Sequence, residues 1–391
     1  MLVKILAYFV PFAINFLNGG FFFITAHRFS LGDCPRIIVA SSLTAWGIAY
    51  CLVTSLIGKK VNDSNALKLI LSGGVILMLT SIGFIIFDGL YIQLLWLALC
   101  GCGAALFCTP FQLFAKSIES GEKKEQGTVK ATAFYTLTWS MGFASGPLAF
   151  AKLPLHAGFA ITLALAAAVT GSVLLIALCR KGKTAPREED DMPQEEKQLI
   201  FPEKCYSKLA ILGWIVGGLG TVTISQIRGM WPKTGKELNF TQDQVAYVLA
   251  LVSYVQAFTA LLLARSKSWM WKRLPAFFMS ACGIAALIAF AFCKTLPAFY
   301  LAAAVYGIYS GCLYFYLVYH SLAHPSKNGF FVAGNEVVVG ITSMIAPLAG
   351  GFIADCFQFT GAAFIFAAIM VFTAFLFQLS ILNPEKLAEG K

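Results

Sequence analysis

Residues 181–191 read Lys-Gly-Lys-Thr-Ala-Pro-Arg-Glu-Glu-Asp-Asp, and mixed charge continues from there to Lys204. This long polar stretch has no apolar periodicity, which predicts a flexible linker over residues 181–206. Six mostly apolar stretches precede it and six follow it. The polar stretch therefore divides the chain into two halves of similar length, residues 1–180 and residues 207–391.

The composition of the chain places both halves in a membrane. Hydrophobic residues make up 58% of the sequence and charged residues 12%, whereas soluble domains carry about 25% charged residues. Each apolar stretch has about the 20 residues that a helix needs to cross a bilayer core of about 30 Å. The stretches are continuously apolar rather than alternating, which favours helices. We expect spans at roughly residues 5–27, 35–57, 67–87, 90–115, 130–151, 157–179, 207–230, 244–265, 274–292, 296–322, 329–353 and 361–382.

The two halves share landmarks at a constant offset. Arg28 precedes Arg228 by 200 positions, and Pro147-Leu148-Ala149 precedes Pro347-Leu348-Ala349 by the same interval. A repeated six-helix membrane unit is typical of proteins that move a solute between the two faces of a bilayer. We therefore predict an all-α integral membrane protein with twelve transmembrane helices, arranged as two pseudo-symmetric six-helix bundles.

Lysine and arginine set the expected orientation. With the N-terminus in the cytoplasm, 22 of the 29 Lys and Arg residues fall on cytoplasmic segments, as the positive-inside rule requires. We expect a multi-pass protein of the plasma (inner) membrane with both termini cytoplasmic. The net charge of +10 is then explained by loops beside anionic lipids, so the expected partner is the lipid bilayer and not nucleic acid. The seven remaining cations are Arg28, Arg36, Lys152, Arg228, Lys233, Lys236 and Lys294.

The fifth and eleventh spans carry motifs of small residues and proline. The fifth contains Gly142-Phe-Ala-Ser-Gly146-Pro147, and the eleventh contains Ala346-Pro347-Leu348-Ala349-Gly350-Gly351. Small residues let helices approach closely, and proline bends a helix. The expected hinge residues are Gly142, Gly146, Pro147, Pro347, Gly350 and Gly351.

Six plus six helices, a central cytoplasmic loop and the Gly142–Pro147 motif resemble the major facilitator superfamily (MFS) of secondary transporters. The motif is similar to the G-x-x-x-G-P signature of that family. The loop after the second span departs from the family pattern G-x-x-x-D-R-x-G-R-R, since Gly58 is followed by Lys59, Lys60 and Val61 and the loop holds no Arg. The resemblance implies alternating access around a site between two lobes, in a monomer that binds a small-molecule substrate.

Few ionisable groups lie inside the spans, where they are costly and usually functional. Glu336 lies about two turns inside the eleventh span beside Asn335, and His320 lies in the tenth span on a stripe of tyrosines. Both fall toward the cytoplasmic ends of their spans. One interpretation is a proton-coupling or gate group formed by Glu336, His320 and Asn335. The other is a hydrogen bond at the gate that does not titrate.

Arg28 and Arg228 end the first and seventh spans, which line the central cavity in the resembled family. Two cations at pseudo-symmetric positions can clamp an anion, because arginine suits forked oxyanions. This interpretation predicts an exchanger of organic anions or phosphate esters. Both residues also lie near the outer interface, where their guanidinium groups can extend to the lipid headgroups instead.

Uncharged polar and aromatic residues on the same helices favour another substrate class. Amides and aromatic faces suit a sugar, a nucleoside or a similar polar metabolite. The candidate substrate-binding residues, with the two arginines included, are Asn15, Asn18, Arg28, Trp46, Tyr135, Trp139, Gln226, Arg228, Tyr306 and Tyr309.

The leading prediction is a secondary active transporter of a small polar organic solute, working by alternating access, with Glu336 as the candidate proton site. The alternatives are the anion exchanger, an exporter of lipophilic drugs or lipids, which the 35 Phe residues favour, and a sensor that binds solute without moving it. The sequence shows no nucleophile with a His-Asp partner, no metal cluster and no phosphate-binding loop. We therefore expect no enzyme activity, no cofactor and no metal.

Overall fold

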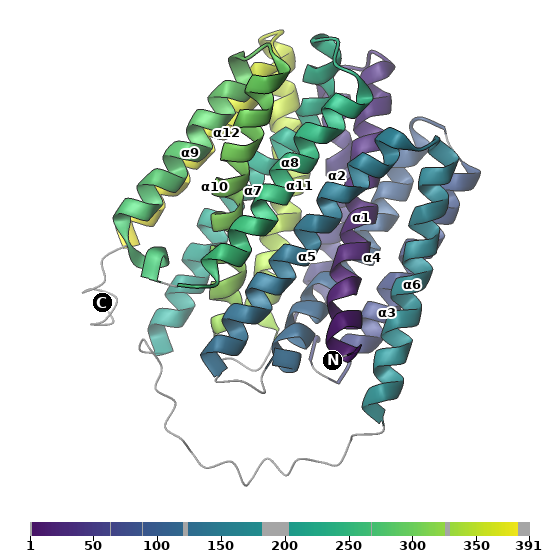
Figure 1. The fold of residues 1–391 in the computed structure, drawn as a ribbon, viewed down its shortest axis with the longest axis vertical. Coiled ribbons are helices and arrows are strands. Elements are labelled where there is room, and N and C mark those ends of the chain that lie inside the picture. Colours follow the sequence, from purple (N-terminus) through teal and green to yellow (C-terminus); the bar gives the residue numbers. More distant parts are fainter. Residues whose placement is uncertain are drawn as a thin grey trace.

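The computed structural model describes residues 2–62, 64–87, 89–119, 124–181, 203–266, 268–324 and 329–381. Within these ranges the chain forms twelve α-helices, one short 3₁₀ helix and no β-strand, which confirms the predicted fold class (Figure 1). The predicted linker lies outside the described residues except at its ends, which belong to α6 and α7. The elements are α1 (Leu2–Leu31), α2 (Arg36–Ile57), α3 (Ala66–Ile86), α4 (Ile92–Glu119), α5 (Lys124–Lys152), α6 (Leu155–Lys181), α7 (Glu203–Glu237), α8 (Gln242–Leu263), η1 (Ser268–Trp271), α9 (Arg273–Phe292), α10 (Leu296–Ala323), α11 (Phe330–Cys356) and α12 (Gly361–Ile381).

Eleven of the described helices have the length and apolarity of a membrane span. The exception is α5, in which hydroxyl side chains recur along the helix. Several of them donate to a carbonyl of the preceding turn, as Thr132 Oγ1 does to the Thr128 carbonyl and Ser145 Oγ to the Met141 carbonyl, both at 2.9 Å. These bonds satisfy the hydroxyl groups within the helix itself. The helix packs between α1 and α8, so its polar side chains lie among protein.

Helix α7 continues beyond the predicted end at residue 230, through Pro232 to Glu237. Trp231 holds the additional turns: its Nε1 donates to the Val245 carbonyl at 2.9 Å, and its ring packs on phenylalanines of α9 and α10. A proline costs a helix a hydrogen bond, and this packing offsets the loss. As a result Arg228 lies nine residues before the end of α7, inside the bundle rather than at its rim.

Helices α1–α6 form one lobe and α7–α12 the other (Figure 1). Equivalent helix pairs pack in each lobe: α1 with α5 and α7 with α11, α2 with α4 and α8 with α10, α3 with α6 and α9 with α12. This correspondence is the pseudo-symmetry that the 200-residue offset predicts. We call the end at which α1 begins and α12 ends the proximal end of the bundle, and the opposite end the distal end.

The closest approach within the first lobe joins α1 and α5. A Cβ atom at Gly146 would overlap the Phe16 carbonyl and lie 2.5 Å from the Gly20 nitrogen, and a Cβ at Gly142 would overlap the Phe12 carbonyl. Two helices can meet this closely only where a residue carries no side chain. The two glycines predicted as hinges are therefore contact points between α1 and α5.

The remaining predicted hinge residues lie at other helix contacts. Gly350 accommodates the Gln226 side chain of α7, and Gly351 lies against the backbone of α2. Pro347 faces α7, and Pro147 lines a small cavity on the distal side of the molecule. Their role as hinges stays a prediction.

Replacing Gly146 with alanine should destabilise the protein, because the new methyl group would overlap the backbone of α1. We expect the free energy of unfolding to fall by about 1–3 kcal/mol, the range for overpacked cores. Gly171 of α6 is the control, since nothing lies within 4 Å of a Cβ placed there. Gly171→Ala should leave the stability unchanged or raise it slightly. Thermal unfolding in detergent measures both, and equal melting temperatures would contradict the interpretation.

Candidate functional site

Two helix pairs form the largest contacts between the lobes, α2 with α11 and α5 with α8. On the first of these seams, glycines bring the two backbones together. A Cβ at Gly47 would lie 2.6 Å from the Met344 nitrogen, and a Cβ at Gly340 would lie 2.9 Å from Cys51 Cα. Thr44 Oγ1 also donates to the Met344 carbonyl at 2.9 Å. The seam between α2 and α11 is therefore a direct backbone contact.

Charged side chains close the α2–α11 seam at its distal end. Arg36 Nη2 donates to Glu237 Oε1 of α7 at 2.9 Å. The Asp355 carboxylate of α11 accepts from the backbone N–H groups of Arg36 and Ile37 at 3.2 and 3.1 Å. A carboxylate at this position satisfies the first N–H groups of α2 and meets the positive end of the helix dipole. The start of α2 is thus bound to both α7 and α11.

Two further charge pairs connect the lobes at the distal end. Lys236 donates to the Asp33 carboxylate, and this hydrogen bond, together with the lysine charge, holds the pKa of Asp33 below its usual range. On the α5–α8 seam Lys152 pairs with Asp243. Exposed pairs contribute little stability individually, but all of them join one lobe to the other.

The lobes also meet at the proximal end. A Cβ at Gly58, just after α2, would lie 2.5 Å from the Ala333 Cβ of α11. Lys116 Nζ of α4 donates to the Leu322 carbonyl of α10 at 2.5 Å. Contacts at both ends therefore bound the space between the lobes.

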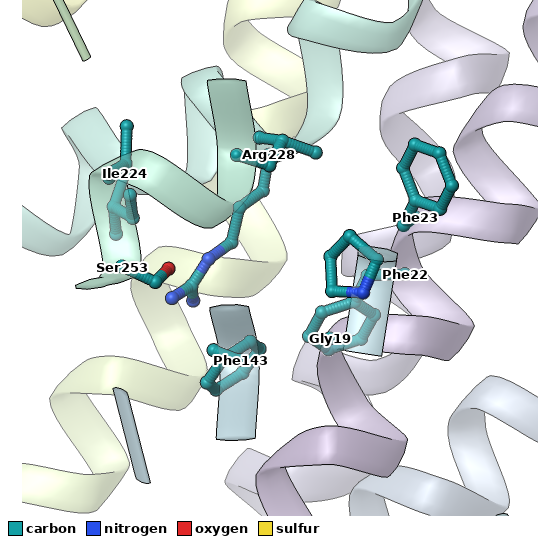
Figure 2. A pocket seen from close by; sticks show the side chains of 10 residues that line it. Gly19, Phe22, Phe23, Phe143, Ile224, Arg228 and Ser253 are labelled. Atoms are coloured by element: carbon teal, nitrogen blue, oxygen red, sulfur yellow. The ribbon is translucent and has the colours of Figure 1, made fainter. Parts of the chain in front are cut away.

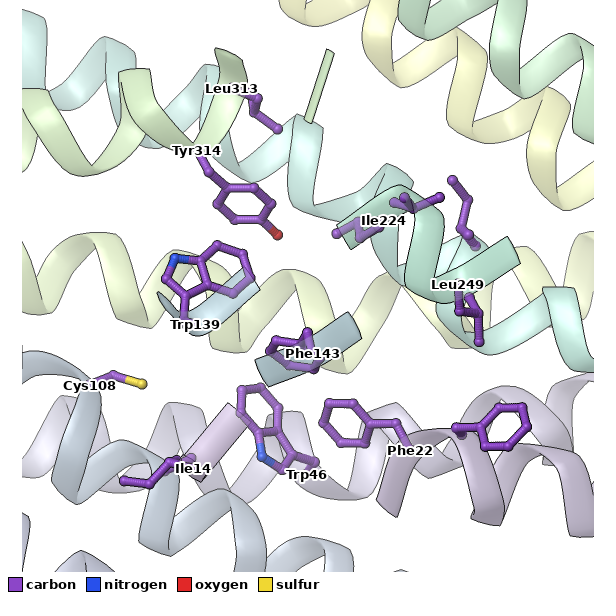
Figure 3. Close-up of a cluster of buried hydrophobic side chains, with 14 of the residues drawn as sticks. Ile14, Phe22, Trp46, Cys108, Trp139, Phe143, Ile224, Leu249, Leu313 and Tyr314 are labelled. Atoms are coloured by element: carbon purple, nitrogen blue, oxygen red, sulfur yellow. The ribbon is translucent and has the colours of Figure 1, made fainter. Parts of the chain in front are cut away.

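A central cavity lies between these two sets of contacts. The space between its lining atoms, counted together with the part that is open to solvent, is about 760 Å³. Aromatic side chains from both lobes form much of its wall, and Figure 3 shows Trp46, Trp139 and Tyr314 gathered there. Its amide, charged and serine groups include Asn15, Asn18, Ser225, Arg228, Asn335 and Glu336.

Arg228 of α7 supplies the positive charge of the central cavity. Its guanidinium carbon lies 3.9 Å from the ring centroid of Phe143 of α5, a cation–π contact between the lobes. Figure 2 shows the guanidinium directed toward Phe143, with Ser253 of α8 nearby. Its Nη2 is buried and has no hydrogen-bond partner among the described residues. A buried donor in this state can bind an acceptor on a ligand.

Glu336 of α11 supplies the negative charge and is 6% exposed. Its carboxylate accepts hydrogen bonds from the Tyr50 hydroxyl of α2, from Gln112 Nε2 of α4 and from Asn335 Nδ2, the last at 3.2 Å. Two of these three donors belong to the other lobe. A buried carboxylate needs such donors to offset its lost hydration. The charge of Glu336 thus links the lobes.

A second polar cluster repeats this arrangement through the pseudo-symmetry. Gln256 of α8 donates to Ser140 Oγ of α5 at 2.6 Å and accepts from Ser310 Oγ of α10 at 2.6 Å. Helices α5, α8 and α10 correspond to α11, α2 and α4. Glu336 bonds directly to two helices of the other lobe, whereas the Gln256 cluster crosses between the lobes only through Ser140. The Glu336 cluster contains a carboxylate, whereas the Gln256 cluster is uncharged.

The structure brings six of the ten predicted substrate-binding residues to the central cavity. These are Asn15, Asn18, Trp46, Tyr135, Trp139 and Arg228. Their role in binding stays a prediction.

The other four predicted binding residues are not among those that line the central cavity. Arg28 lies one turn before the end of α1, so the two arginines are not brought together there. Gln226 and Tyr306 bond within the second lobe, to the Ala346 carbonyl and to Thr223 respectively. Tyr309 lines a separate cavity.

The predicted coupling group is brought together only in part. Asn335 contacts Glu336, but the His320 ring lies among Tyr316, Tyr319 and Trp271, with centroids at 4.3, 5.5 and 6.4 Å. Helix α10 is buried along most of its length, so its sequence pattern does not indicate which face meets α11. His320 lies on the face of α10 that packs against α7 and η1.

Several residues of the site were not predicted from the sequence, among them Phe143, Tyr314 and Gln112. Phe143 and Tyr314 stand in spans rich in aromatic residues, and no motif separates cavity aromatics from packing ones. Gln112 carried a usable signal, because an amide inside a span is costly unless it has a specific partner. Its partner, Glu336, lies 224 positions away.

Comparison with known proteins agrees with this architecture. The sequence profile of the Major Facilitator Superfamily matches residues 40–326. The crystal structure of the human organic anion transporter MFSD10 (TETRAN) is similar, with a TM-score of 0.65, 13% identity and 96% of each chain covered. The E. coli fucose:proton symporter FucP is similar with a TM-score of 0.57 and 14% identity, over 97% of this chain and 98% of the other. A search of curated proteins finds no match.

Two six-helix lobes around an enclosed central cavity are the architecture of a secondary transporter. The chain belongs to the Major Facilitator Superfamily, since the family match covers well over half of its length. The predicted family is confirmed, and so is the prediction of a multi-pass transporter rather than an enzyme.

Removing the Tyr50 hydroxyl should weaken the link between the lobes, because Glu336 then loses a donor from α2. For Tyr50→Phe we expect the free energy of unfolding to fall by about 1–3 kcal/mol, the cost of a hydrogen bond to a buried polar group. Tyr91, which is 64% exposed, provides the control Tyr91→Phe with no expected change. Thermal unfolding in detergent compares the two, and a Tyr50→Phe protein as stable as the control would count against this link.

Proposed function

We propose that this transporter carries a small organic anion together with a proton, with Arg228 binding the anion and Glu336 binding the proton. The observation that supports this most strongly is the Arg228 guanidinium in the enclosed cavity, whose Nη2 donor is unused among the described residues. Arginine in such a position favours a forked oxyanion, such as a carboxylate.

The other unused polar atoms at the cavity fit an anion that also carries a hydroxyl group. Within the described ranges, Trp46 Nε1 is a buried donor without a partner and Asn335 Oδ1 a buried acceptor without one. Asn15 and Asn18, by contrast, use their amide donors on the protein: Asn15 Nδ2 on the Pro11 carbonyl at 2.8 Å and Asn18 Nδ2 on Asn15 Oδ1 at 3.4 Å. The amides expected to serve a neutral solute are thus largely occupied, which favours the anion.

Charge balance supports coupling the anion to a proton. The residues that line the cavity include one cation, Arg228, and one acid, Glu336. An anion alone would leave a net negative charge in a region of low dielectric constant, which is unfavourable. A proton on Glu336 restores neutrality. The cavity then has the same net charge when it is empty as when it holds the anion and the proton.

Protonation of Glu336 also links the binding of a proton to separation of the two lobes. The carboxylate accepts from Tyr50 and Gln112 across the boundary between the lobes. A proton turns one of its oxygens from an acceptor into a donor, so one of these groups can no longer donate to that oxygen. The contact between the lobes therefore weakens at Glu336, on the proximal side where α11 begins. The ion pairs at the distal end are unaffected.

A neutral polar solute is the second candidate, because Trp46, Trp139 and Tyr135 provide aromatic faces on which a sugar can stack. Proteins of this fold include one named as an organic anion transporter and one named as a fucose:proton symporter. At 13% and 14% identity these structures support the fold alone. The choice between the candidates therefore depends on Arg228.

We also propose that the proximal end faces the cytoplasm of a plasma membrane. The support is the concentration of Lys and Arg on the segments at that end. A monomer completes the proposal, since both lobes that line the central cavity belong to the same chain.

Neutralising Arg228 should abolish recognition of the anion. In Arg228→Gln we expect the affinity for the best ligand among a panel of carboxylates and hydroxy acids to fall about thirtyfold or more, as for the loss of a buried charged partner. Arg28→Gln is the matched control and should bind normally. Ligand-induced thermal stabilisation and uptake into proteoliposomes provide the measurements. If Arg228→Gln binds anions like the wild type, or if sugars alone stabilise the protein, the second candidate replaces the first.

Replacing Glu336 with glutamine should separate transport from the pH gradient. An amide at this position cannot take up a proton, so uptake of the anion should no longer increase with an imposed proton gradient, while binding of the anion persists. Uptake into proteoliposomes with and without a pH gradient measures this for Glu336→Gln, with wild-type protein in parallel. A variant that keeps its dependence on the gradient would remove Glu336 from the coupling mechanism.

A further inference from the structure

A second cavity lies inside the C-terminal lobe and shares no lining residue with the central one. It is bounded by η1, α7, α9, α10 and α12, and the space between its lining atoms, counted together with the part open to the outside, is about 360 Å³. The transport mechanism proposed above does not use it. Its lining includes Trp269, Met279, Tyr309, Leu313, Tyr316 and Gln378.

Three polar atoms of this cavity are unused. The hydroxyl groups of Tyr309 and Tyr316 and the Trp269 Nε1 are buried and have no hydrogen-bond partner among the described residues. The two tyrosines are 4% and 2% exposed. Buried polar groups are nearly always hydrogen-bonded, and an indole N–H can only donate. Three such groups in one cavity indicate a ligand that brings hydrogen-bond acceptors.

The rest of the lining limits the chemistry of that ligand. No lining residue is charged, and Val216, Leu313 and Ala374 make part of the wall apolar. Burying a charge against such a wall would be costly. The enclosed part of the ligand is therefore neutral, with an apolar portion and acceptor atoms such as carbonyl oxygens.

The partly exposed lining residues of the cavity belong to η1, α9 and α12, near the proximal end. Tyr309 and Tyr316 are buried at its floor, whereas Trp269, Met279 and Gln378, from η1, α9 and α12, are partly exposed. The outer faces of α9 and α12 carry exposed apolar side chains, as a surface against lipid requires. Helix η1 follows the proximal end of α8, and the cation Lys272 comes directly after it.

We propose that this cavity binds the glycerol-ester region of an anionic phospholipid from the adjoining leaflet. The ester carbonyls accept from the tyrosine hydroxyls and the Trp269 indole, and part of an acyl chain lies along the apolar wall. The headgroup remains at the rim, where Lys272 and the other cations of the α8–α9 segment attract an anionic lipid.

The test compares two phosphatidylglycerols with the same chains, one with ester and one with ether linkages, because the ether lipid lacks the carbonyl acceptors. Native mass spectrometry of the full chain measures how much of each stays bound. We expect the wild type to prefer the diester about tenfold, the effect of one or two hydrogen bonds. The double variant Tyr309→Phe with Tyr316→Phe should bind both lipids equally. Tyr319→Phe, on the same helix but outside the cavity lining, should keep the preference.

Two results would overturn the proposal. A wild type without any preference for the diester would indicate a cavity that holds water alone. A preference that persists in the double variant would place the bound lipid elsewhere. The melting temperature shows whether the double variant is folded. If the double variant does not fold, each single variant replaces it in the measurement, with an expected partial loss of the preference for the diester. Diester phosphatidylcholine tests the headgroup, since binding as strong as that of phosphatidylglycerol would overturn the role of Lys272.

Discussion

Glu336 belongs to α11 of one lobe and accepts hydrogen bonds from α2 and α4 of the other. A carboxylate at membrane depth is costly unless hydrogen-bond donors surround it. The lobes therefore stay together around Glu336, or its charge is neutralised. The close contact of α2 with α11 makes the bonds possible, because glycines such as Gly47 and Gly340 bring the two backbones together. The central cavity between the lobes depends on this contact.

The two lobes repeat one another in helix packing but not in chemistry. The cluster around Gln256 joins α5, α8 and α10 as the cluster around Glu336 joins α11, α2 and α4. One cluster is an amide with two hydroxyl groups, whose hydrogen bonds do not change with pH. The other contains a group that a proton can neutralise. A symmetric scaffold therefore has one link that contains an ionisable group and one that does not.

Arg228 shows how a local feature of a helix decides the chemistry of the cavity. Helix α7 runs through Pro232 because Trp231 is packed between the neighbouring helices. That extension places Arg228 inside the bundle, where the guanidinium rests on Phe143 of the opposite lobe. The pseudo-symmetric Arg28 lies one turn before the end of its helix and is not among the residues that line the cavity. The same residue type at equivalent positions thus has different surroundings in the two lobes.

The sequence by itself determined the class of this protein. Continuous apolar stretches of about 20 residues fix a helical membrane fold, and the offset of 200 residues fixes the two lobes, because both are properties of neighbouring or repeated positions. Only the tertiary structure decided which polar residues meet. Gln112 and Glu336 are 224 positions apart, and on helices buried on every side no periodicity marks the face that carries the cavity. For that reason the sequence did not show that His320 packs against Tyr316, Tyr319 and Trp271. Phe143 and Tyr314 were likewise indistinguishable from packing residues until the lobes were brought together.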